Sequence, residues 1–316
     1  MGARKVALYV DECLGRYGFP NGHPFGPARL SVFLEEANRR GLVGRSALRT
    51  ASVAPAEIIS LFHHEDFERF VRAHEHSEGV LLDGADTPSF LGCHTAAATV
   101  VGAAVDATRR LVTGEALRAF VPIAGLHHGA RDAAAGFCIF NDIGVVIELL
   151  RREYAIQRVA YVDIDAHHGD GVYYAFDDDP ALCFADIHQD GRTLYPGTGD
   201  ASESGRGAAQ GTKLNLPVPP GADDRNFYAA WTQIEAHLLR AQPEFIILQC
   251  GTDSIAGDPL TAMRFSAAAH EHATRRLCRV AEQLGHGRVL ALGGGGYNLF
   301  NVAEGWSRVL AALLED

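Results

Sequence analysis

The segment Tyr161-Val-Asp-Ile-Asp-Ala-His-His-Gly-Asp170 joins an apolar run to a close group of carboxylates and imidazoles. The apolar residues 159–162 predict a strand buried on both faces, as strands are in a parallel sheet covered by helices. Because side chains alternate across a strand, we expect Asp163, Asp165 and His167 on one side. Charged groups packed together in a buried place require a cation or a proton. The segment therefore predicts an α/β fold with an ionic site at a strand end.

Three other strand-like runs end in chemically active side chains. They are residues 244–250, followed by Asp253; residues 120–126, followed by His127 and His128; and residues 288–292, followed by four glycines and Tyr297. Taken alone, an Asp-x-His pair is better explained as a hydrogen-bonded pair at a strand end. In a parallel sheet, however, polar groups at the carboxyl ends of several strands meet in one crevice, where such folds bind ligands. The four runs together favour a single functional site.

Strand-like runs alternate with helical patterns along most of the chain, which predicts a mostly parallel central sheet with helices on both faces. Helices are expected at about 27–40, 95–112, 140–153, 225–240, 266–284 and 299–313. The glycine-rich residues 197–211 are expected to form a loop. This loop follows the strand 182–188 and includes part of Tyr195-Pro-Gly-Thr-Gly-Asp200, which places that motif near the carboxyl-end rim.

The composition predicts a large buried core in one or two domains, of which one is favoured. The chain has 316 residues, 47% of them hydrophobic, and shows no linker or internal repeat, so we expect one domain over residues 1–316. No segment reaches the roughly 18 apolar residues of a membrane span, and six scattered cysteines lack a Cys-x-x-Cys pair, which predicts a cytoplasmic protein with reduced thiols. A net charge of −11 without a basic block argues against nucleic-acid binding and is compatible with a cationic substrate. The sequence carries no sign of the oligomeric state.

Two carboxylates and an imidazole, from Asp165, His167 and Asp253, form a ligand set that suits zinc or another divalent transition ion. With no cysteine in the set, such a site keeps positions open for water and substrate, as catalytic sites do. A bound ion would polarise a carbonyl and lower the pKa of water towards about 7. The pattern therefore predicts metal-assisted hydrolysis.

The tandem His127-His128 supplies candidates for the base that holds the proton. Asp163 and Asp170 are placed to receive the outer ring N–H groups of these histidines, which would fix their tautomers. A tandem histidine alone is equally compatible with a surface or capping pair. Tyr297, after the glycine run, can donate its hydroxyl to the oxyanion of an amide under attack. A phosphate-binding loop is disfavoured because no Lys-Ser/Thr follows the glycines.

With these residues the chain resembles the zinc-dependent histone deacetylases and their bacterial relatives, most closely the acetoin-utilisation deacetylase-like branch. The resemblance covers nearly the whole chain through seven motifs: His23-Pro24 to Arg29, Leu126-His-His128, Gly136-Phe-Cys-Ile-Phe-Asn-Asp142, Asp163 to Gly171, Pro196-Gly-Thr-Gly199, Gln249-Cys-Gly-Thr-Asp253 and Gly293 to Tyr297. It implies a single-domain arginase-deacetylase α/β fold and hydrolysis of an acylated amine.

The resemblance also implies a role for each site residue. It implies zinc ligation by Asp165, His167 and Asp253, with iron(II) or cobalt(II) as substitutes, and a potassium site near the same segment. It further implies His128 as general base and then acid, His127 as its electrostatic support, Asp163 and Asp170 as the groups that orient them, and Tyr297 as the donor to the acyl carbonyl.

A narrow tunnel for an alkyl-amine stem is a further implication of the resemblance. Phe137 and Tyr195 would form its walls with Gly136 beside them, Leu260 would lie at its rim, and Asp86 would hold substrate backbone amides there. An ordinary core position is the alternative for Phe137 and Leu260.

The chain departs from the family pattern at three places. Ile123-Ala124-Gly125 stands where relatives have a glycine run, which is expected to narrow the cavity beneath the metal. Thr252 replaces a common alanine, and Tyr195 replaces a common phenylalanine. Because neither of the last two changes removes a catalytic group, we expect activity to survive them.

Three competing functions remain open in the sequence. A two-manganese ureohydrolase is disfavoured because Gly169 and Ile255 stand where the second metal would need carboxylates. A binding module for acylated lysine without catalysis is disfavoured because every catalytic role has its residue. Among substrates, acyl-lysine in a protein or peptide is preferred because Asp86 can grip a peptide backbone, and acetylated polyamines are the runner-up.

Overall fold

The computed structural model describes residues 6–315, and it is built on one sheet of eight parallel strands. The strand order is β2-β1-β3-β8-β7-β4-β5-β6. The strands are β1 Ala7–Tyr9, β2 Ala47–Arg49, β3 Arg118–Val121, β4 Val159–Asp163, β5 Leu182–Gln189, β6 Lys213–Val218, β7 Phe245–Gln249 and β8 Val289–Leu292. Because all the pairings are parallel, every strand points its carboxyl end to the same edge of the sheet.

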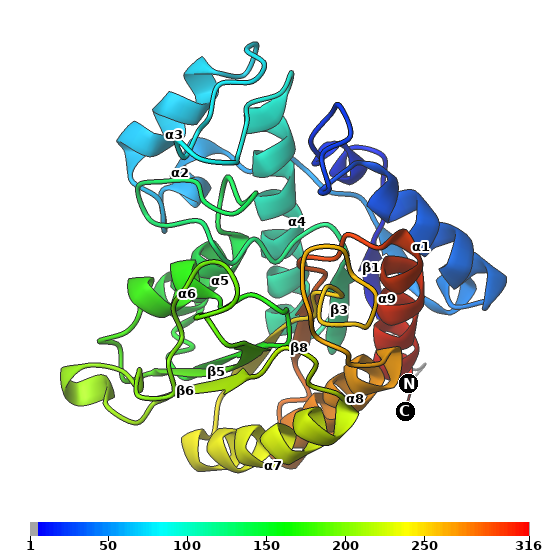
Figure 1. Cartoon of the computed structure of the whole chain (residues 1–316), viewed down its shortest axis with the longest axis vertical. Coiled ribbons are helices and arrows are strands. Elements are labelled where there is room, and N and C mark those ends of the chain that lie inside the picture. Colours follow the sequence, from blue (N-terminus) through cyan, green and yellow to red (C-terminus); the bar gives the residue numbers. More distant parts are fainter. Residues whose placement is uncertain (1–5, 316) are drawn as a thin grey trace.

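Helices cover the sheet in two layers (Figure 1). Helix α7 packs on α8, α8 on α9 and α9 on α1, while α4 packs on α5. The bounds are α1 Ala28–Arg39, α2 Ala56–Ile59, α3 Glu65–Ala73, α4 Cys93–Thr113, α5 Asp142–Tyr154, α6 Asp170–Ala175, α7 Asp224–Ala241, α8 Ala267–Gln283 and α9 Leu299–Leu313, with short 3-10 turns at Leu14–Arg16, Val43–Arg45 and Gly207–Ala209. The predicted α/β class with helices on both faces is confirmed.

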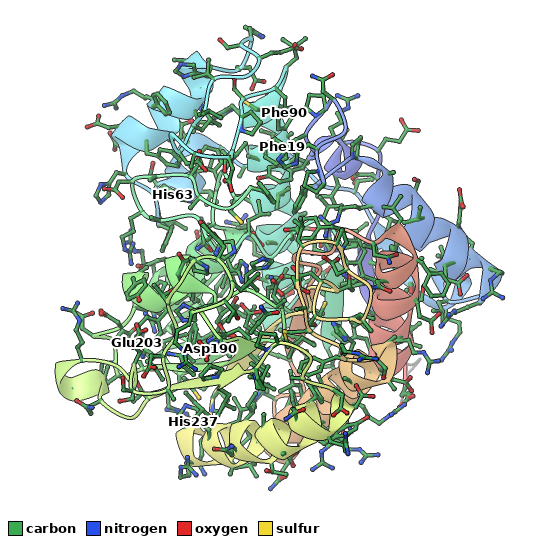
Figure 2. The ribbon with its side chains drawn as sticks, in the orientation of Figure 1. Phe19, His63, Phe90, Asp190, Glu203 and His237 are labelled. Carbon is green, nitrogen blue, oxygen red and sulfur yellow. The ribbon has the colours of Figure 1, made fainter. Side chains whose placement is uncertain are left out.

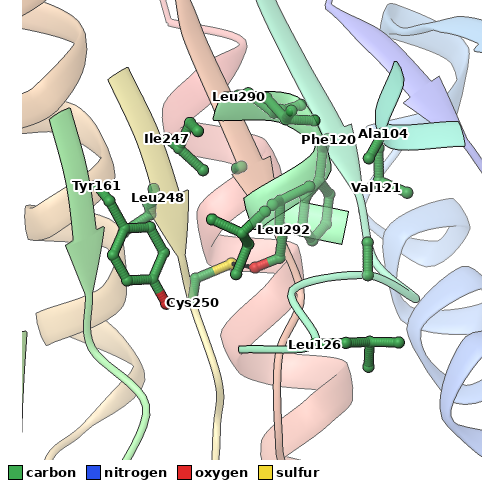
Figure 3. Packing of buried hydrophobic residues seen from close by; sticks show 14 of the residues in the cluster. Ala104, Phe120, Val121, Leu126, Tyr161, Ile247, Leu248, Cys250, Leu290 and Leu292 are labelled. Atoms are coloured by element: carbon green, nitrogen blue, oxygen red, sulfur yellow. Dashed lines mark hydrogen bonds between the residues drawn. The ribbon is translucent and has the colours of Figure 1, made fainter. Parts of the chain in front are cut away.

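The central strands form the core because their apolar side chains have no solvent-facing side. Ile247, Leu248 and Leu290 are fully buried between the two helix layers, and Figure 3 shows them packed beside Phe120 and Tyr161. Burying one such side chain contributes roughly 1.5–3 kcal/mol. This rigid sheet fixes the positions from which the loops at its carboxyl edge begin.

Each of the six predicted helices is present within a few residues of its expected bounds. Capping explains why several begin where they do: Asn141 accepts a hydrogen bond from the Gly144 N–H at the start of α5, and Asp223 forms a capping box with Asn226 at the start of α7. The expected loop at 197–211 is also present, apart from one short 3-10 turn. The edge strands β2 and β6 and the helices α2, α3 and α6 were not predicted.

The cysteines and the helices bear on two expectations about the whole chain. All six cysteines are free, and five are buried, whereas Cys13 is exposed. Within residues 6–315, no helix combines the length and the apolar character needed to cross a membrane.

Candidate metal-dependent active site

The two carboxylates and the imidazole predicted as ligands lie together at the carboxyl edge of the sheet. Each of Asp165, His167 and Asp253 offers one ligand atom, and these atoms all lie within 4.8 Å of one another. All three side chains are buried. Strand β4 ends at Asp163, so Asp165 and His167 stand in the segment just beyond it, and Asp253 follows β7 in the same way. Adjacent parallel strands therefore bring the group together.

Backbone and side-chain donors fix the orientation of these carboxylates. The Gly295 N–H and the Gln249 side-chain amide donate to Asp165 Oδ2, each at 2.8 Å. The Ala166 N–H donates to Asp253 Oδ1, also at 2.8 Å. A side chain at Gly295 would collide with Asp253 and Asp165, which explains why a glycine stands in this loop. The carboxylates are thus held in place before any ion binds.

The electrostatics of this group call for a positive charge. Burial lowers the pKa of His167, but its contacts with Asp165 at 3.0 Å and Asp253 at 3.1 Å outweigh burial and raise the pKa to about 10. Burial and the neighbouring Asp165 raise the pKa of Asp253 to about 7. In the protein alone, a proton on the imidazole supplies the cation. Two oxygens and one nitrogen in this arrangement fit a divalent transition ion with open positions for water and substrate.

The tandem histidines form two parallel pairs with carboxylates. His127 Nδ1 lies 2.8 Å from Asp163 Oδ2, and His128 Nδ1 lies 2.6 Å from Asp170 Oδ1. The two imidazole rings are neighbours, with centroids 4.0 Å apart. Burial, followed by the adjacent His127, lowers the pKa of His128, so His128 is neutral at pH 7. The alternative of a surface or capping pair is wrong, because both histidines are buried.

Asp163 carries more interactions than the sequence indicated. The Tyr161 hydroxyl donates to the same Oδ2 that faces His127, and the Asp165 N–H donates to Oδ1 at 3.0 Å. Its partner in register on β5 is Asp186, which the sequence analysis did not select. Burial, and then the charges of Asp186 and Asp165, raise the pKa of Asp163 well above its ordinary value.

Tyr297 stands at the end of the glycine run, beside the ligand group. Its backbone N–H donates to Asp258 Oδ2 at 2.8 Å. Burial, followed by the charges of Asp253 and Asp165, raises the pKa of the phenol well above its ordinary value. The hydroxyl therefore keeps its proton and is able to act as a donor.

A small cavity of about 10 Å³ lies between these groups, which is room for about one water. Its walls include His128, Asp165 and Tyr297 as well as Gly125 and Leu126. Ile123 and Ala124, which are expected to narrow the cavity beneath the metal, are buried and do not line this cavity.

Arg29 ends the first motif of the family resemblance, but the sequence did not indicate it as a site residue. It is buried, its guanidinium donates to the carbonyl oxygens of Gly294 and Gly296, and it lies over the rings of Phe25 and Trp306. Its Nη1 has no hydrogen-bond partner among the described residues. The sequence could not indicate Arg29, because a single arginine that packs behind the glycine run shows no recognisable spacing from the other site residues.

The predicted tunnel residues fall into two groups. Gly136 lies against His128 and Tyr195, since a Cβ at Gly136 would be 2.6 Å from His128 Cδ2 and 3.0 Å from Tyr195 Cε1. The Phe137 ring lies edge-on to Tyr297, with centroids 6.0 Å apart, and the Tyr195 ring lies edge-on to His128 at 5.1 Å. These aromatic side chains border the predicted catalytic groups His128 and Tyr297.

The remaining two predicted residues are on the surface. Leu260 is 40% exposed, and its N–H donates to Asp258, whose other oxygen accepts from Tyr297. Asp86 is exposed, and burial of part of its carboxyl together with Asp83 raises its pKa. The core alternative is therefore wrong for Leu260 and incomplete for Phe137, which is only partly buried.

As a class, an α/β domain with this arrangement at the carboxyl ends of its strands has the groups of a metal-dependent hydrolase. The comparisons with known proteins then identify the family. A family model described as the histone deacetylase domain matches residues 23–313. The chain belongs to the histone deacetylase family, whose members are hydrolytic deacetylases.

Relatives of known name agree with this assignment along most of their length. The acetoin utilization protein AcuC of Bacillus subtilis (strain 168) is 35% identical over 302 residues, covering 93% of this chain and 78% of the relative. The AcuC protein of Staphylococcus xylosus is 33% identical, covering 98% of this chain and 82% of the relative. Among solved structures, the crystal structure of the HDA15 HD domain superposes with a TM-score of 0.90 at 25% identity, covering 99% of this chain and 89% of that one.

Proposed function

We propose that this deacetylase uses zinc to hydrolyse N6-acetyl-lysine, or a related acyl-lysine, in proteins or peptides. The observation that carries the proposal is the meeting of three kinds of group in one place. The ligand atoms of Asp165, His167 and Asp253, the two histidine–carboxylate pairs and the Tyr297 hydroxyl all border one cavity or lie directly behind its wall. Together they supply every role that amide hydrolysis requires.

The proposed metal would be held by Asp165, His167 and Asp253, whose buried oxygen and nitrogen atoms suit zinc. When bound there, zinc would supply Lewis acidity for the acyl carbonyl and would acidify a water molecule. Burial raises the pKa of Asp165, but the charge of His127 and the contact with His167 outweigh burial and hold the pKa well below its usual range, so the carboxylate is ionised and available to a cation.

His128 is the proposed proton carrier. Its Nδ1 faces Asp170, so the network assigns the ring proton to Nδ1 and leaves Nε2 as an acceptor. Nε2 would take a proton from the attacking water and return it to the amine that leaves as the C–N bond breaks, giving a carboxylic acid and a free amine. Asp163 holds His127 in the same way, which orients a second imidazole beside the first.

Tyr297 is the proposed donor to the carbonyl oxygen. As water adds to the acyl carbon, that oxygen gains negative charge, and a hydroxyl aimed at it stabilises the transition state more than the ground state. The raised pKa of Tyr297 keeps the proton available. Both the base and the oxyanion donor are therefore provided by side chains that are already fixed in the protein.

Peptide acyl-lysine is the favoured substrate because Asp86 is exposed and adjoins Thr87, whose hydroxyl accepts a hydrogen bond from the Phe137 N–H. A carboxylate there can accept hydrogen bonds from backbone amides on either side of the acyl-lysine. The same observation supports acetylated polyamines as a second candidate, because Asp86 and Asp83 together would also attract a cationic amine. Free, mostly buried cysteines fit a reducing compartment, so we place the protein in the cytoplasm.

A matched panel of substrates tests the proposed substrate class. The zinc-loaded protein would be assayed on acetyl-, propionyl-, butyryl- and lactoyl-lysine peptides beside acetylated polyamines. Hydrolysis of peptides, with the acetyl chain preferred because the cavity is only about 10 Å³, is the expected result. Activity confined to polyamines would replace the peptide assignment, and zinc binding without turnover on any of them would favour a binding module.

A further inference from the structure

The Gly136-Phe137 turn has an unusual backbone for its sequence. Ala135 and Cys138 exchange hydrogen bonds, Cys138 N–H to Ala135 O at 2.8 Å and Ala135 N–H to Cys138 O at 3.1 Å. The two residues between them have positive φ, +51° for Gly136 and +68° for Phe137. Positive φ at both central positions is the geometry of a type I′ turn, which favours Asn, Asp or Gly. A bulky aromatic residue is disfavoured in this conformation.

Glycine is used at the first of the two positions, not the second. A Cβ at Gly136 would be 2.6 Å from Cδ2 of His128, so no side chain fits there without moving the proposed base. The backbone strain therefore remains at Phe137. Such strain persists only where the surrounding structure over-determines the conformation.

Two side-chain hydroxyls from distant segments bind the backbone of Phe137 on both sides. The Phe137 N–H donates to Thr87 Oγ1 at 3.0 Å, and the Phe137 carbonyl oxygen accepts from the Tyr17 hydroxyl at 2.7 Å. The Tyr17 oxygen also accepts from the Ile139 N–H at 3.0 Å. Thr87 and Tyr17 are both buried. Hydrogen bonds in a buried place resist opening because the freed groups would find no water.

Each of these hydroxyls is itself held in place. Asp83 Oδ1 accepts from the Thr87 N–H at 3.1 Å and also from the N–H groups of Ala85 and Asp86. The ring of Tyr17 packs edge-on against Phe25 and Phe90, with centroids 5.7 and 6.3 Å apart. Figure 2 shows Phe90 and Phe19 close together in this aromatic group.

We propose that Tyr17 and Thr87 are positioning residues that clamp Phe137 in its strained conformation and so set the shape of the substrate tunnel. The clamp holds the Phe137 ring edge-on to His23, with centroids 4.5 Å apart, and to Tyr297. Asp86 and Thr87 belong to the same loop, in which Asp83 accepts hydrogen bonds from both backbone N–H groups. The proposed rim residue Asp86 and the proposed wall residue Phe137 are therefore held by the same loop. The inference rests on the proposed function, in which Phe137 is the tunnel wall.

Paired substitutions separate the hydroxyl from the side chain that carries it. Thr87→Val keeps the shape of the side chain and removes the hydroxyl, whereas Thr87→Ser keeps the hydroxyl. Tyr17→Phe removes the second bond. Tyr9→Phe is a matched control, since Tyr9 is also a buried tyrosine whose hydroxyl bonds a side chain, Asp106, outside the site.

The kinetic readout is the split between KM and kcat on an acetyl-lysine peptide. Loss of one hydrogen bond should raise KM about tenfold in Thr87→Val and in Tyr17→Phe, because stem binding is weakened, with a smaller change in kcat. Thr87→Ser and Tyr9→Phe should remain close to the unchanged protein. An unchanged KM in Thr87→Val, or an equal loss in Thr87→Ser, would overturn the proposal.

Amide hydrogen exchange tests the clamp without any substrate. The amides of residues 136–139 should exchange faster in Thr87→Val and Tyr17→Phe, and not in Tyr9→Phe, when all are compared as zinc-loaded proteins. If the unchanged protein hydrolyses no acyl-lysine, the proposed function is wrong. The amide exchange rates of residues 136–139 then still test whether Thr87 and Tyr17 hold Phe137 in place. Equal protection of 136–139 in all variants would overturn the clamp, whatever the activity.

Discussion

Tyr297 is the residue at which catalysis can be separated from metal binding and folding. Its phenol keeps its proton, because burial and the nearby carboxylates raise its pKa. It is not a member of the buried Asp-His-Asp group. In the proposed mechanism its side chain therefore contributes only through the hydrogen bond that it donates.

Tyr297→Phe should lower kcat on an acetyl-lysine peptide on the order of 10²- to 10³-fold, as expected for loss of one oxyanion donor. Zinc content and the midpoint of thermal unfolding should stay close to those of the unchanged protein. Tyr228→Phe, which alters a half-exposed tyrosine on α7, is the control. Full turnover in Tyr297→Phe would remove the tyrosine from the mechanism.

At the residue scale, the sequence predicted the groups that carry a recognisable spacing. Asp165 and His167 follow one strand and Asp253 follows its neighbour, and the structure brings their ligand atoms together. Their roles in catalysis remain predictions. Gln249, which donates to Asp165, and Asp186, which neighbours Asp163, could not be selected, because a single polar residue inside a buried strand shows no pattern until its neighbour across the sheet is known.

Helix α5 is tied to the loop of the tandem histidines by one carboxylate. Asp142, in the first turn of α5, accepts hydrogen bonds from the N–H groups of Gly125, at 3.0 and 3.1 Å, and Leu126, at 2.8 Å. The helix therefore sets the path of the chain just before His127. Burial raises the pKa of Asp142 to about 6, although these donors oppose the change.

This raised pKa makes stability depend on pH in a defined direction. Between about pH 4 and 6 the folded protein keeps the Asp142 proton and the unfolded chain loses it, so the free energy of unfolding falls as pH rises through this window. A rise of about two pKa units corresponds to roughly 3 kcal/mol. Above pH 6 this contribution is constant.

The Asp142→Asn variant lacks the carboxyl group at position 142, so its stability does not depend on the protonation of that group. Urea unfolding of both proteins should show the unchanged protein losing stability relative to the variant between pH 4 and 6, by up to roughly 3 kcal/mol, with a constant difference above pH 6. A difference that does not vary with pH would mean that the hydrogen bonds from the Gly125 and Leu126 N–H groups fully offset the cost of burial.

At the element scale, long amphipathic helices were predictable and short edge elements were not. Helices α8 and α9 repeat apolar residues at helical spacing over 17 and 15 residues. Strand β2 has only three residues, and β6 contains Lys213, Asn215 and Pro217. Such strands are stabilised by the neighbouring strand more than by their own side chains, so their sequences show little strand character.

At the scale of the whole molecule, the parallel sheet brings motifs that are far apart in the sequence together at one site. Residues from four separated strand ends meet because all strands point the same way, and the carboxyl ends of parallel strands are where such folds bind ligands. The alternation of strands and helices therefore predicted both the fold and the location of the site. It could not predict the strained Gly136-Phe137 turn, which depends on contacts with two distant segments.

The most direct test of a metal-dependent deacylase is turnover on an acetyl-lysine peptide before and after removal of the metal. The account predicts that chelator abolishes hydrolysis, that about one equivalent of zinc per chain restores it, and that Asp253→Ala folds but does not recover with zinc. Undiminished hydrolysis by protein shown to be free of metal would contradict the central claim.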